Sequence, residues 1–364
     1  MGKPRTHVPP SEQITERKRS HLDLCAKAAV EHPEKTTLFE EVDFIHNALP
    51  ELALEEIDLS TEFLGKRLAA PFLITGMTGG TADAFAINRD LAALAERCQI
   101  AFGLGSQRAM QRDPSLAWTY QIREFAPTTV VLANIGLTQA ATQPTEALRE
   151  LLQLVGADAL CIHLNPAQEL IQPEGDRDFR NGYSAIERVV RELGAAVIVK
   201  ETGCGISTAV AARLHALGVE YVDFSGAGGT SWVRVESLRT QGRAHRLGEL
   251  FASWGIPTAA ALAAARHLPL KRIASGGLRN GLDAAKAIAL GADLCGMALP
   301  VFRAYQQGGR EGAVSFLQQC ADELRTAMLL TGSASLRDLQ SQPVVLGPRL
   351  QTWLNTLNQL QGRK

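Results

Sequence analysis

The chain has 364 residues, 46% of them hydrophobic, which is enough to bury a large core in one or two domains. Its 37 Lys and Arg residues balance 38 Asp and Glu residues, and neither half is acidic or basic, so nothing indicates a nucleic-acid or membrane surface. We therefore expect a small-molecule partner.

The six cysteines lie far apart, form no CxxC pair, and in several cases fall within apolar runs. This spacing favours reduced, buried thiols over a disulfide framework or a zinc site. No charged and then apolar leader opens the chain, and no apolar run reaches about 18 residues. We expect a soluble, cytoplasmic protein.

A regular pattern begins at Pro71, after a first segment that looks helical or extended. Short runs rich in Val, Ile and Leu alternate with stretches that carry Leu and Ala at helical spacing, which is typical of parallel strands covered by helices. The predicted strands span residues 72–77, 100–105, 130–136, 159–165, 197–203, 221–226, 272–277 and 294–299.

Eight strands in βα alternation over about 230 residues predict an α/β fold, a closed (β/α)8 TIM barrel with N-terminal and C-terminal extensions. We divide the chain into an N-terminal extension (1–70), the barrel (71–305), and a C-terminal helical extension packed on it (306–364). An open doubly wound sheet is the alternative, but no GxGxxG follows the first strand. The connection over residues 226–254 is unusually long, as in lids and binding loops.

Small and polar residues follow every predicted strand, at the end where such barrels carry their active sites. A turn or a helix cap explains any one of them, but their recurrence favours a binding site. Gly276 and Gly277 precede a predicted helix, so backbone N–H groups there can hold a phosphate, with Ala298 and Leu299 completing the cradle. Lys200 ends the run "VIVK" and either reaches solvent or meets an anionic ring.

Together, Met77-Thr78-Gly79-Gly80, Asn134, Lys200, Ser225 with Gly228-Gly229, and Gly276-Gly277 form the pattern that a barrel needs to hold a flavin mononucleotide (FMN). Strand-end backbone and Asn134 would meet the ring edge, Lys200 would stabilise its negative side, and the glycine turns would take the phosphate.

The motifs "RKRSHL", "TGMTGG", "GSQRA", "ANIG", "HLNPAQE", "VKETGCGIS", "DFSGAGGTSW", "ASGGLRNGLDAAKAIALGAD" and "GMALP" stand in this order along the chain. In this respect the sequence closely resembles the type 2 isopentenyl-diphosphate isomerases. The resemblance runs from about Glu16 to the "TGSASLRDL" segment. It implies an isomerase of isoprenoid biosynthesis that interconverts isopentenyl and dimethylallyl diphosphate by moving a double bond with no net redox change.

The resemblance also implies the cofactors and most site residues. It implies reduced FMN, kept reduced by NADPH or another reductant, and Mg²⁺ bound with the diphosphate. The implied FMN contacts are Gly76, Met77, Thr78, Ser106, Asn134, Lys200, Ser225, Thr230, Gly276, Gly277, Ala298 and Leu299. The implied diphosphate contacts are Arg17, Lys18, Ser106, Gln107 and Arg108. A homotetramer or octamer is implied as well.

The stretch "HLNPAQE" gathers four polar side chains within seven residues. His163 and Asn165 alternate onto one side of the fourth predicted strand, and Gln168 and Glu169 follow on the loop, so all four can converge on one ligand. Under the resemblance, Glu169 is the Mg²⁺ ligand, Gln168 faces the alkene end of the substrate beside the flavin, and His163 and Asn165 bind diphosphate or orient Gln168.

Two other readings stay open. In a flavin-dependent 2-hydroxy-acid oxidase, the "SGAGGT" segment would place a base histidine at Ala227 and a carboxylate-binding arginine at Thr230, and this chain has neither. A non-catalytic barrel that binds FMN predicts a degraded substrate site, whereas Arg17, Lys18, Arg108, Gln168 and Glu169 are all present.

Overall fold

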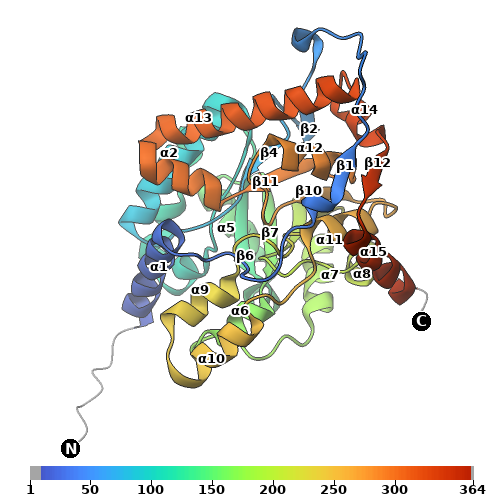
Figure 1. Cartoon of the computed structure of the whole chain (residues 1–364). Helices are drawn as coiled ribbons and strands as arrows, with labels where there is room; N and C mark the ends of the chain where they lie inside the picture. The colour runs from blue at the N-terminus through green and yellow to red at the C-terminus, as the bar shows by residue number, and fades with distance from the viewer. Residues whose placement is uncertain (1–9, 362–364) are drawn as a thin grey trace, which may run out of the picture.

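The computed structural model describes residues 10–361, and its centre is a closed barrel of eight parallel strands in the order β10-β11-β4-β5-β6-β7-β8-β9 (Figure 1). The strands are β4 (Phe72–Ile74), β5 (Ala101–Gly103), β6 (Val131–Gly136), β7 (Ala159–Leu164), β8 (Ala196–Glu201), β9 (Tyr221–Asp223), β10 (Lys271–Ala274) and β11 (Leu294–Met297). The predicted (β/α)8 barrel is confirmed, and the open-sheet alternative is wrong.

The predicted strands are all present, but most of them end earlier than expected. For example, β4 stops at Ile74 rather than at residue 77, and β9 stops at Asp223 rather than at residue 226. The reason is that the chain leaves the hydrogen-bonded ladder as it enters the small-residue segments that follow. These segments therefore form loops above the barrel.

Alternation along the strands fills the barrel with apolar side chains at one end and polar ones at the other. Leu132, Cys161 and Ile198 belong to one buried cluster inside the barrel, whereas their neighbours in sequence pack outward against the helices. Because side chains alternate along a strand, the residues two positions later also face the interior. The amino-terminal layer of the barrel is thus hydrophobic core, and the next layer is polar.

A short hairpin closes the amino-terminal end of the barrel. Strands β2 (Thr61–Phe63) and β3 (Lys66–Leu68) pair in antiparallel fashion. Phe63 and Leu68 from this hairpin are buried in the same cluster as the barrel's interior residues. Since this end is sealed by apolar packing, only the carboxyl end remains for a site.

Helices surround the barrel and bury the outward faces of its strands. Those between the strands are α2 (Ala82–Cys98), α3 (Arg108–Arg112), α4 (Leu137–Thr142), α5 (Thr145–Val155), α6 (Pro166–Ile171), α7 (Gly182–Glu192), α8 (Thr208–Ala216), α9 (Trp232–Arg239), α10 (Gly242–Phe251), α11 (Thr258–Ala264) and α12 (Gly281–Ala289). Short 3-10 turns are η1 (Phe39–Glu41), η2 (Leu54–Glu56), η3 (Pro114–Tyr120) and η4 (Arg123–Phe125).

Segments before and after the barrel meet on its outside (Figure 1). These segments are α1 (Pro10–Lys27), β1 (Val42–Phe44), α13 (Leu299–Thr331), α14 (Leu336–Ser341), β12 (Val344–Leu346) and α15 (Pro348–Gln361). Strand β1 pairs with β12, although about 300 residues separate them in sequence. Helix α13 is broken at Gly308 and Gly309, and α1 packs against α9 and α13 beside the carboxyl end of the barrel.

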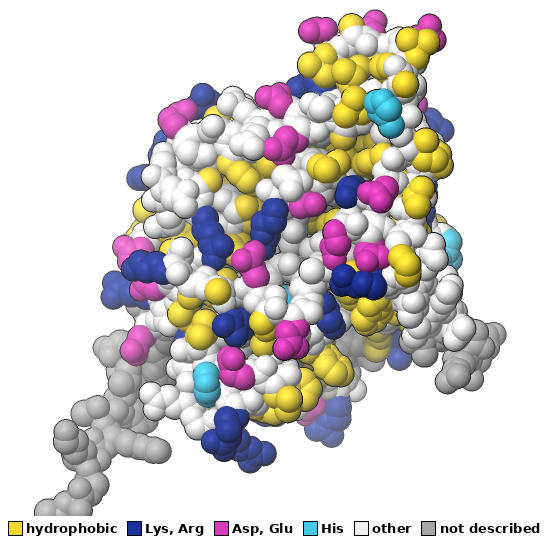
Figure 2. Space-filling model, viewed as in Figure 1, with side chains coloured by type: hydrophobic (Ala, Val, Ile, Leu, Met, Phe, Trp, Pro, Cys, Tyr) yellow, Lys and Arg dark blue, Asp and Glu magenta, His cyan; other side chains and the backbone are white. Residues whose placement is uncertain are grey.

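Acidic and basic side chains are interspersed over the face seen in Figure 2, without a large area of one sign. Hydrophobic side chains gather on the segment that projects between β1 and β2, where Ile45, Leu49 and Leu54 are exposed. Within residues 10–361, no helix combines the length and the apolar character needed to cross a membrane.

Candidate active site

A cavity opens at the carboxyl end of the barrel and collects side chains from far apart in the sequence. All but one of the residues predicted to contact FMN, substrate or metal line it: Arg17, Lys18, Gly76, Met77, Thr78, Ser106, Arg108, Asn134, His163, Asn165, Gln168, Glu169, Lys200, Ser225, Thr230, Gly276, Gly277, Ala298 and Leu299. Gly79, Gly80, Gly228 and Gly229, which belong to the wider FMN pattern, are not among the lining residues. The sequence therefore indicated a large part of this cavity, but other lining residues, among them His21, Gln139 and Trp232, were not predicted.

Gln107 is the exception, because its side chain lies outside the cavity and is fully buried. Its Oε1 accepts a hydrogen bond from the Asn134 backbone N–H at 2.8 Å, and its own N–H donates to the Asn134 carbonyl at 2.9 Å. Its Nε2 lies 3.5 Å from the Met110 sulfur. In this structure the Gln107 side chain therefore joins the segment that follows β5 to the end of β6.

The turns after β9 and β10 form a close-packed backbone cradle. Gly276 and Gly277 have φ of +88° and +97°, a region that side-chain-bearing residues rarely adopt. A Cβ on Gly276 would lie 2.3 Å from the Gly226 carbonyl oxygen, and one on Gly277 would lie 2.9 Å from the Gly229 nitrogen. Backbone groups alone can occupy this place, which suits the close approach of a phosphate.

His163 is held as a neutral imidazole in the polar layer of the barrel. Burial, reinforced by the charges of Lys200, Lys18 and Arg108, lowers its pKa to about 3. The Asn134 amide nitrogen donates to the Leu104 carbonyl, so its oxygen accepts from His163 Nδ1 at 2.8 Å. The Nδ1 atom therefore carries the hydrogen, and Nε2 is left as an acceptor.

Lys200 faces the same interior, next to His163 in register on the neighbouring strand. Its Nζ lies 3.4 Å from Asp223 Oδ2 and donates to the Glu201 carbonyl at 2.9 Å. Asp223 is almost completely buried, so the ion pair fixes the ammonium at the barrel mouth. A positive charge is thus maintained where a ring system would rest on the strand ends.

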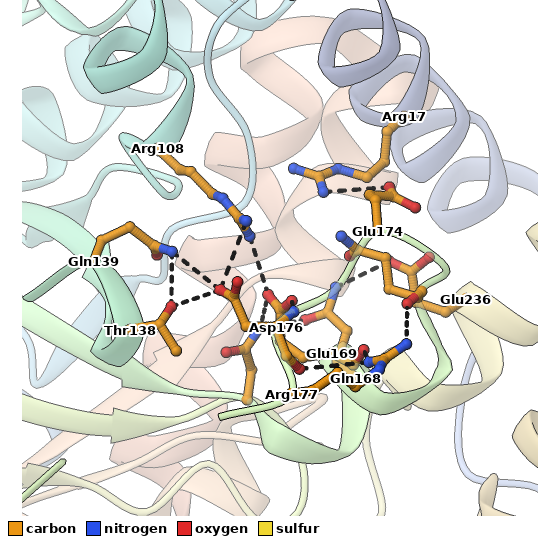
Figure 3. Close-up of polar contacts among 12 residues, drawn as sticks. Arg17, Arg108, Thr138, Gln139, Gln168, Glu169, Glu174, Asp176, Arg177 and Glu236 are labelled. Carbon is orange, nitrogen blue, oxygen red and sulfur yellow. Dashed lines mark hydrogen bonds and ion pairs between the residues drawn. The ribbon is translucent and has the colours of Figure 1, made fainter. Parts of the chain in front are cut away.

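Three cationic side chains from two distant segments line the cavity, and Figure 3 shows two of them, Arg17 and Arg108. Arg17 and Lys18 come from α1, and Arg108 is the first residue of α3. Burial, together with the charges of Arg17 and Arg108, lowers the pKa of Lys18 to about 7. Arg17 pairs with Glu174 at 3.5 Å and Arg108 with Glu169 at 3.4 Å, so carboxylates balance part of this charge. The cluster of cations still suits a ligand that carries several negative charges.

Gln168 and Glu169 lie at the start of α6 and share a network with Asn165. The Asn165 amide donates to Gln168 Oε1 at 3.2 Å and to Glu169 Oε1 at 3.1 Å. Glu169 also forms an ion pair with Arg108 at 3.4 Å, and its Oε2 accepts the Asp176 backbone N–H at 2.7 Å (Figure 3). Asn165 therefore orients the side chains of both Gln168 and Glu169. One of the two roles expected for Asn165 from the sequence is to orient Gln168.

Glu236 is a site residue that the sequence reading missed. Its carboxylate is fully buried on α9 and accepts hydrogen bonds from Gln168 Nε2 at 3.1 Å and His21 Nε2 at 2.9 Å. Burial alone would raise its pKa, but the His21 hydrogen bond, the charge of Arg239 and the Gln168 hydrogen bond together lower it to about 2. An ionised carboxylate thus holds the Gln168 amide in place.

The signal for Glu236 was present but weak. It is an acidic residue at the end of the run "WVRVE", which alternates apolar and charged residues, inside the long connection over residues 226–254. The structure shows that this connection carries α9 and α10, and that Trp232 of α9 lines the cavity. The connection is therefore part of the cavity wall in this structure.

The residues present fit a flavin phosphate and ring. The Thr78 hydroxyl is buried in the cavity wall without a hydrogen-bond partner, so a ligand can satisfy it. The backbone cradle at Gly276 and Gly277 and the cation of Lys200 add a phosphate site and a charge partner for the ring.

A divalent cation also fits, at Glu169. No cluster of three or more His, Cys, Asp or Glu side chains suited to a metal occurs in the described part of the chain. Mg²⁺ needs only one or two carboxylates when phosphate oxygens and water complete its shell. Glu169, beside the arginines, meets that requirement.

Solved flavoprotein structures share the architecture. A flavocytochrome b2 variant superposes with a TM-score of 0.67 at 20% sequence identity, over 96% of this chain and 90% of that one. A mandelate oxidase superposes with a TM-score of 0.62 at 17% identity, over 94% of this chain and 99% of that one. At these identities the likeness concerns the fold alone.

Sequence comparisons are more specific. Residues 121–346 match the family described as FMN-dependent dehydrogenase. An isopentenyl-diphosphate delta-isomerase of Methanothermobacter thermautotrophicus is 45% identical over 94% of this chain and 96% of its own length. One from a Synechococcus species is 47% identical over 92% of this chain and 97% of its own length. The chain therefore belongs to the isopentenyl-diphosphate delta-isomerase family, within the FMN-dependent dehydrogenases.

Proposed function

We propose that this chain interconverts isopentenyl and dimethylallyl diphosphate by a 1,3-allylic proton rearrangement, as a step of isoprenoid biosynthesis. One carbon of the alkene gains a proton, another loses one, and no net oxidation occurs. The observation that carries the proposal is that Arg17, Lys18 and Arg108 line the same cavity as the glycine cradle suited to a phosphate. A diphosphate substrate and a flavin phosphate can then share one site.

FMN would be held with its phosphate in the cradle and its ring on the strand ends. Gly276, Gly277, Ala298 and Leu299 would take the phosphate, and Lys200 would neutralise the anionic edge of the ring. The remaining contacts would come from Gly76, Met77, Thr78, Ser106, Asn134, Ser225 and Thr230. Bound reduced FMN would supply the proton-transfer chemistry that an unactivated alkene requires, with NADPH as the reductant that keeps it reduced.

Glu169 would hold Mg²⁺ against the diphosphate, with Arg17, Lys18, Ser106 and Arg108 binding the remaining phosphate oxygens. An Arg guanidinium binds two oxygens at once, whereas the Lys ammonium acts as a point charge. Gln107 is left out of this set because its hydrogen bonds are already made with Asn134.

Gln168 would face the hydrocarbon end of the substrate, where Asn165 and Glu236 fix its amide. Because Glu236 is ionised and accepts from Gln168 Nε2, the Gln168 oxygen is the atom turned toward Asn165. His163, held neutral by burial, would offer its Nε2 lone pair to the ligand rather than a charge. Gln168, His163 and Asn165 would orient the reacting groups and keep water out.

The test is turnover of isopentenyl diphosphate by the purified protein under anaerobic conditions with FMN, Mg²⁺ and NADPH, each omitted in turn. We expect dimethylallyl diphosphate to form only with FMN and a reductant, and without stoichiometric consumption of NADPH. FMN binding without any isomer formed would retain the flavin site but reject the substrate.

The second candidate function is that of a 2-hydroxy-acid oxidase, and only the shared barrel fold supports it. Ala227 stands where such an oxidase would have its base histidine, and its side chain is fully buried. Thr230 stands where the oxidase would have its arginine, and it carries no charge. Consumption of a 2-hydroxy acid with reduction of FMN would support it. A barrel that merely binds FMN would show neither reaction.

We further propose that the protein is a homo-oligomer, a tetramer or an octamer, in the cytoplasm. Exposed apolar side chains on the segment between β1 and β2, Ile45 and Leu49 among them, support self-association. The six cysteines are unpaired, which suits a reducing compartment. Light scattering after gel filtration measures the oligomeric state, and a monomeric mass would reject self-association.

A further inference from the structure

The loop after α6 supplies a charged side chain that the roles above leave unused. Asp176 lies in the segment that follows Glu169, and its carboxylate contacts three side chains from two elements, α3 and α4 (Figure 3). The Arg108 guanidinium lies 3.6 Å from Asp176 Oδ2, the Thr138 hydroxyl donates to the same oxygen at 2.6 Å, and Gln139 Nε2 donates to it at 3.2 Å.

The backbone at the same position acts on Glu169. The Asp176 N–H donates to Glu169 Oε2 at 2.7 Å, which fixes the carboxylate that also pairs with Arg108. Gly175 makes this approach possible, since a Cβ there would lie 2.1 Å from the Glu169 carbonyl oxygen. Arg177 binds the Glu169 carbonyl as well as that of Gln172, so the loop is tied down on both sides of Asp176.

We infer that Asp176 is a positioning residue that aligns Arg108 with Glu169, so that the guanidinium and the carboxylate meet a Mg²⁺-bound diphosphate together. This inference rests on the proposed function. Two carboxylates, Glu169 and Asp176, converge on the two terminal nitrogens of one guanidinium. The arginine is thereby held in one orientation before the ligand arrives, which reduces the ordering cost of binding.

The sign of the effect follows from the surroundings. The Asp176 carboxylate also repels an incoming diphosphate, but its side chain is about one-third exposed, so solvent and salt screen that repulsion. Arg108 is buried, and its loss of a fixed partner is not compensated by water. Removing the Asp176 charge should therefore weaken binding of the Mg²⁺ diphosphate.

The experiment measures the Kd of inorganic pyrophosphate in the presence of Mg²⁺ by calorimetry on the FMN-loaded, oxidised protein. For Asp176→Asn we expect a rise of about tenfold, because the backbone N–H to Glu169 survives and only the carboxylate is lost. Asp178→Asn is the matched control, since Asp178 lies two residues along the same loop, is exposed and pairs only with Arg180. We expect a change below about twofold there.

Thr138→Val tests whether the effect on pyrophosphate binding depends on the orientation of the Asp176 carboxylate. It removes the hydroxyl that orients Asp176 and should raise the Kd about threefold. Because both changes act through one carboxylate, the double variant should bind no more weakly than Asp176→Asn alone. Additive effects would overturn the inference, as would an Asp176→Asn Kd within twofold of wild type. If Asp176→Asn fails to bind FMN, Thr138→Val decides the question. An unchanged Kd of pyrophosphate in Thr138→Val would then overturn the inference.

Turnover separates this inference from the proposed function. With isopentenyl diphosphate, Asp176→Asn should raise KM about tenfold and leave kcat within about twofold, and Asp176→Glu should recover part of the loss. A proportional fall in kcat without a change in KM would contradict a positioning role. Absence of isomerase activity in the wild type would reject the substrate assignment, while pyrophosphate binding would still decide the role of Asp176.

Discussion

At the scale of single residues, the cavity depends on charges whose ionisation is set by their neighbours. His163 is kept neutral by burial and by the cations around it, whereas Glu236 is kept ionised despite its burial because it accepts hydrogen bonds next to Arg239. The same reasoning makes Lys18 a group that titrates near neutral pH.

Lys18 makes diphosphate binding dependent on pH. Its pKa of about 7 in the empty site means that the ammonium is lost as pH rises, whereas a bound diphosphate favours the charged form. The Kd of Mg²⁺ pyrophosphate should therefore increase about fivefold between pH 7 and pH 8, with proton uptake on binding.

Calorimetry in two buffers of different ionisation enthalpy measures both the affinity and the protons taken up by Lys18. Lys18→Arg is the control, since Arg stays charged over this range, and the ratio of the two affinities removes the ionisation of pyrophosphate itself. A ratio that does not change with pH would contradict the assignment of this titration to Lys18.

Glu169→Gln tests the proposed metal ligand. Gln keeps the size of the side chain and can still accept the Asp176 N–H, but it removes the charge that attracts Mg²⁺. We expect normal FMN binding and a fall of about a hundredfold or more in Mg²⁺-dependent turnover. Glu187→Gln, on the exposed side of α7, should behave as wild type. Unchanged turnover in Glu169→Gln would remove Glu169 from the metal role.

At the scale of elements, α1 completes a cavity that the barrel alone leaves open. Arg17 and Lys18 reach the site only if α1 stays docked, and Arg303 of α13 secures its end. The Arg303 guanidinium donates to the Cys25 carbonyl at 3.1 Å, in the last turn of α1, and to the Ala28 carbonyl at 2.8 Å, just beyond the helix.

Arg303→Gln should loosen α1 without disturbing the barrel. We expect faster amide hydrogen exchange in residues 10–27 and a KM for isopentenyl diphosphate raised about fivefold, while FMN affinity stays the same. Arg325→Gln, on the same helix but paired only with Asp322, is the control. If exchange in α1 increases and KM does not, the docking of α1 is not needed for substrate binding.

At the scale of the whole molecule, the proposed flavin site links ligand binding to the stability of the barrel. FMN at a concentration of 100 times its Kd should stabilise the folded chain by about 2.7 kcal/mol, seen as a rise in Tm. A substitution at Gly277 in the cradle should remove this effect of FMN on the Tm.

Gly277→Ala places a Cβ 2.3 Å from Thr37 Cγ2 at a backbone φ of +97°. It should abolish the FMN-dependent rise in Tm. Gly194→Ala is the matched control, because Gly194 also has a positive φ, of +74°, but nothing lies within 4 Å of the added Cβ. The control should lower Tm slightly and keep the full FMN response. An intact FMN response in Gly277→Ala would reject the cradle as the phosphate site.

The sequence by itself determined the barrel and most of its cavity. Runs of β-branched residues alternate with stretches of helical periodicity, which predicts parallel strands covered by helices. Residues at the carboxyl ends of such strands lie at the active-site face of a barrel, so Asn134, His163 and Lys200 could be placed there from local pattern alone. Local pattern suffices there because each side chain's direction follows from its position in its own strand.

Only the tertiary structure decided which side chains contact one another across the chain. The pairing of His21 with Glu236, the turn of Gln107 toward Asn134, and the reach of Asp176 to Arg108 join residues up to 215 positions apart. The periodicity of the sequence does not predict such contacts. The hydrogen-bond partner of a buried polar side chain depends on which distant residue packs against it, and not on its neighbours in sequence.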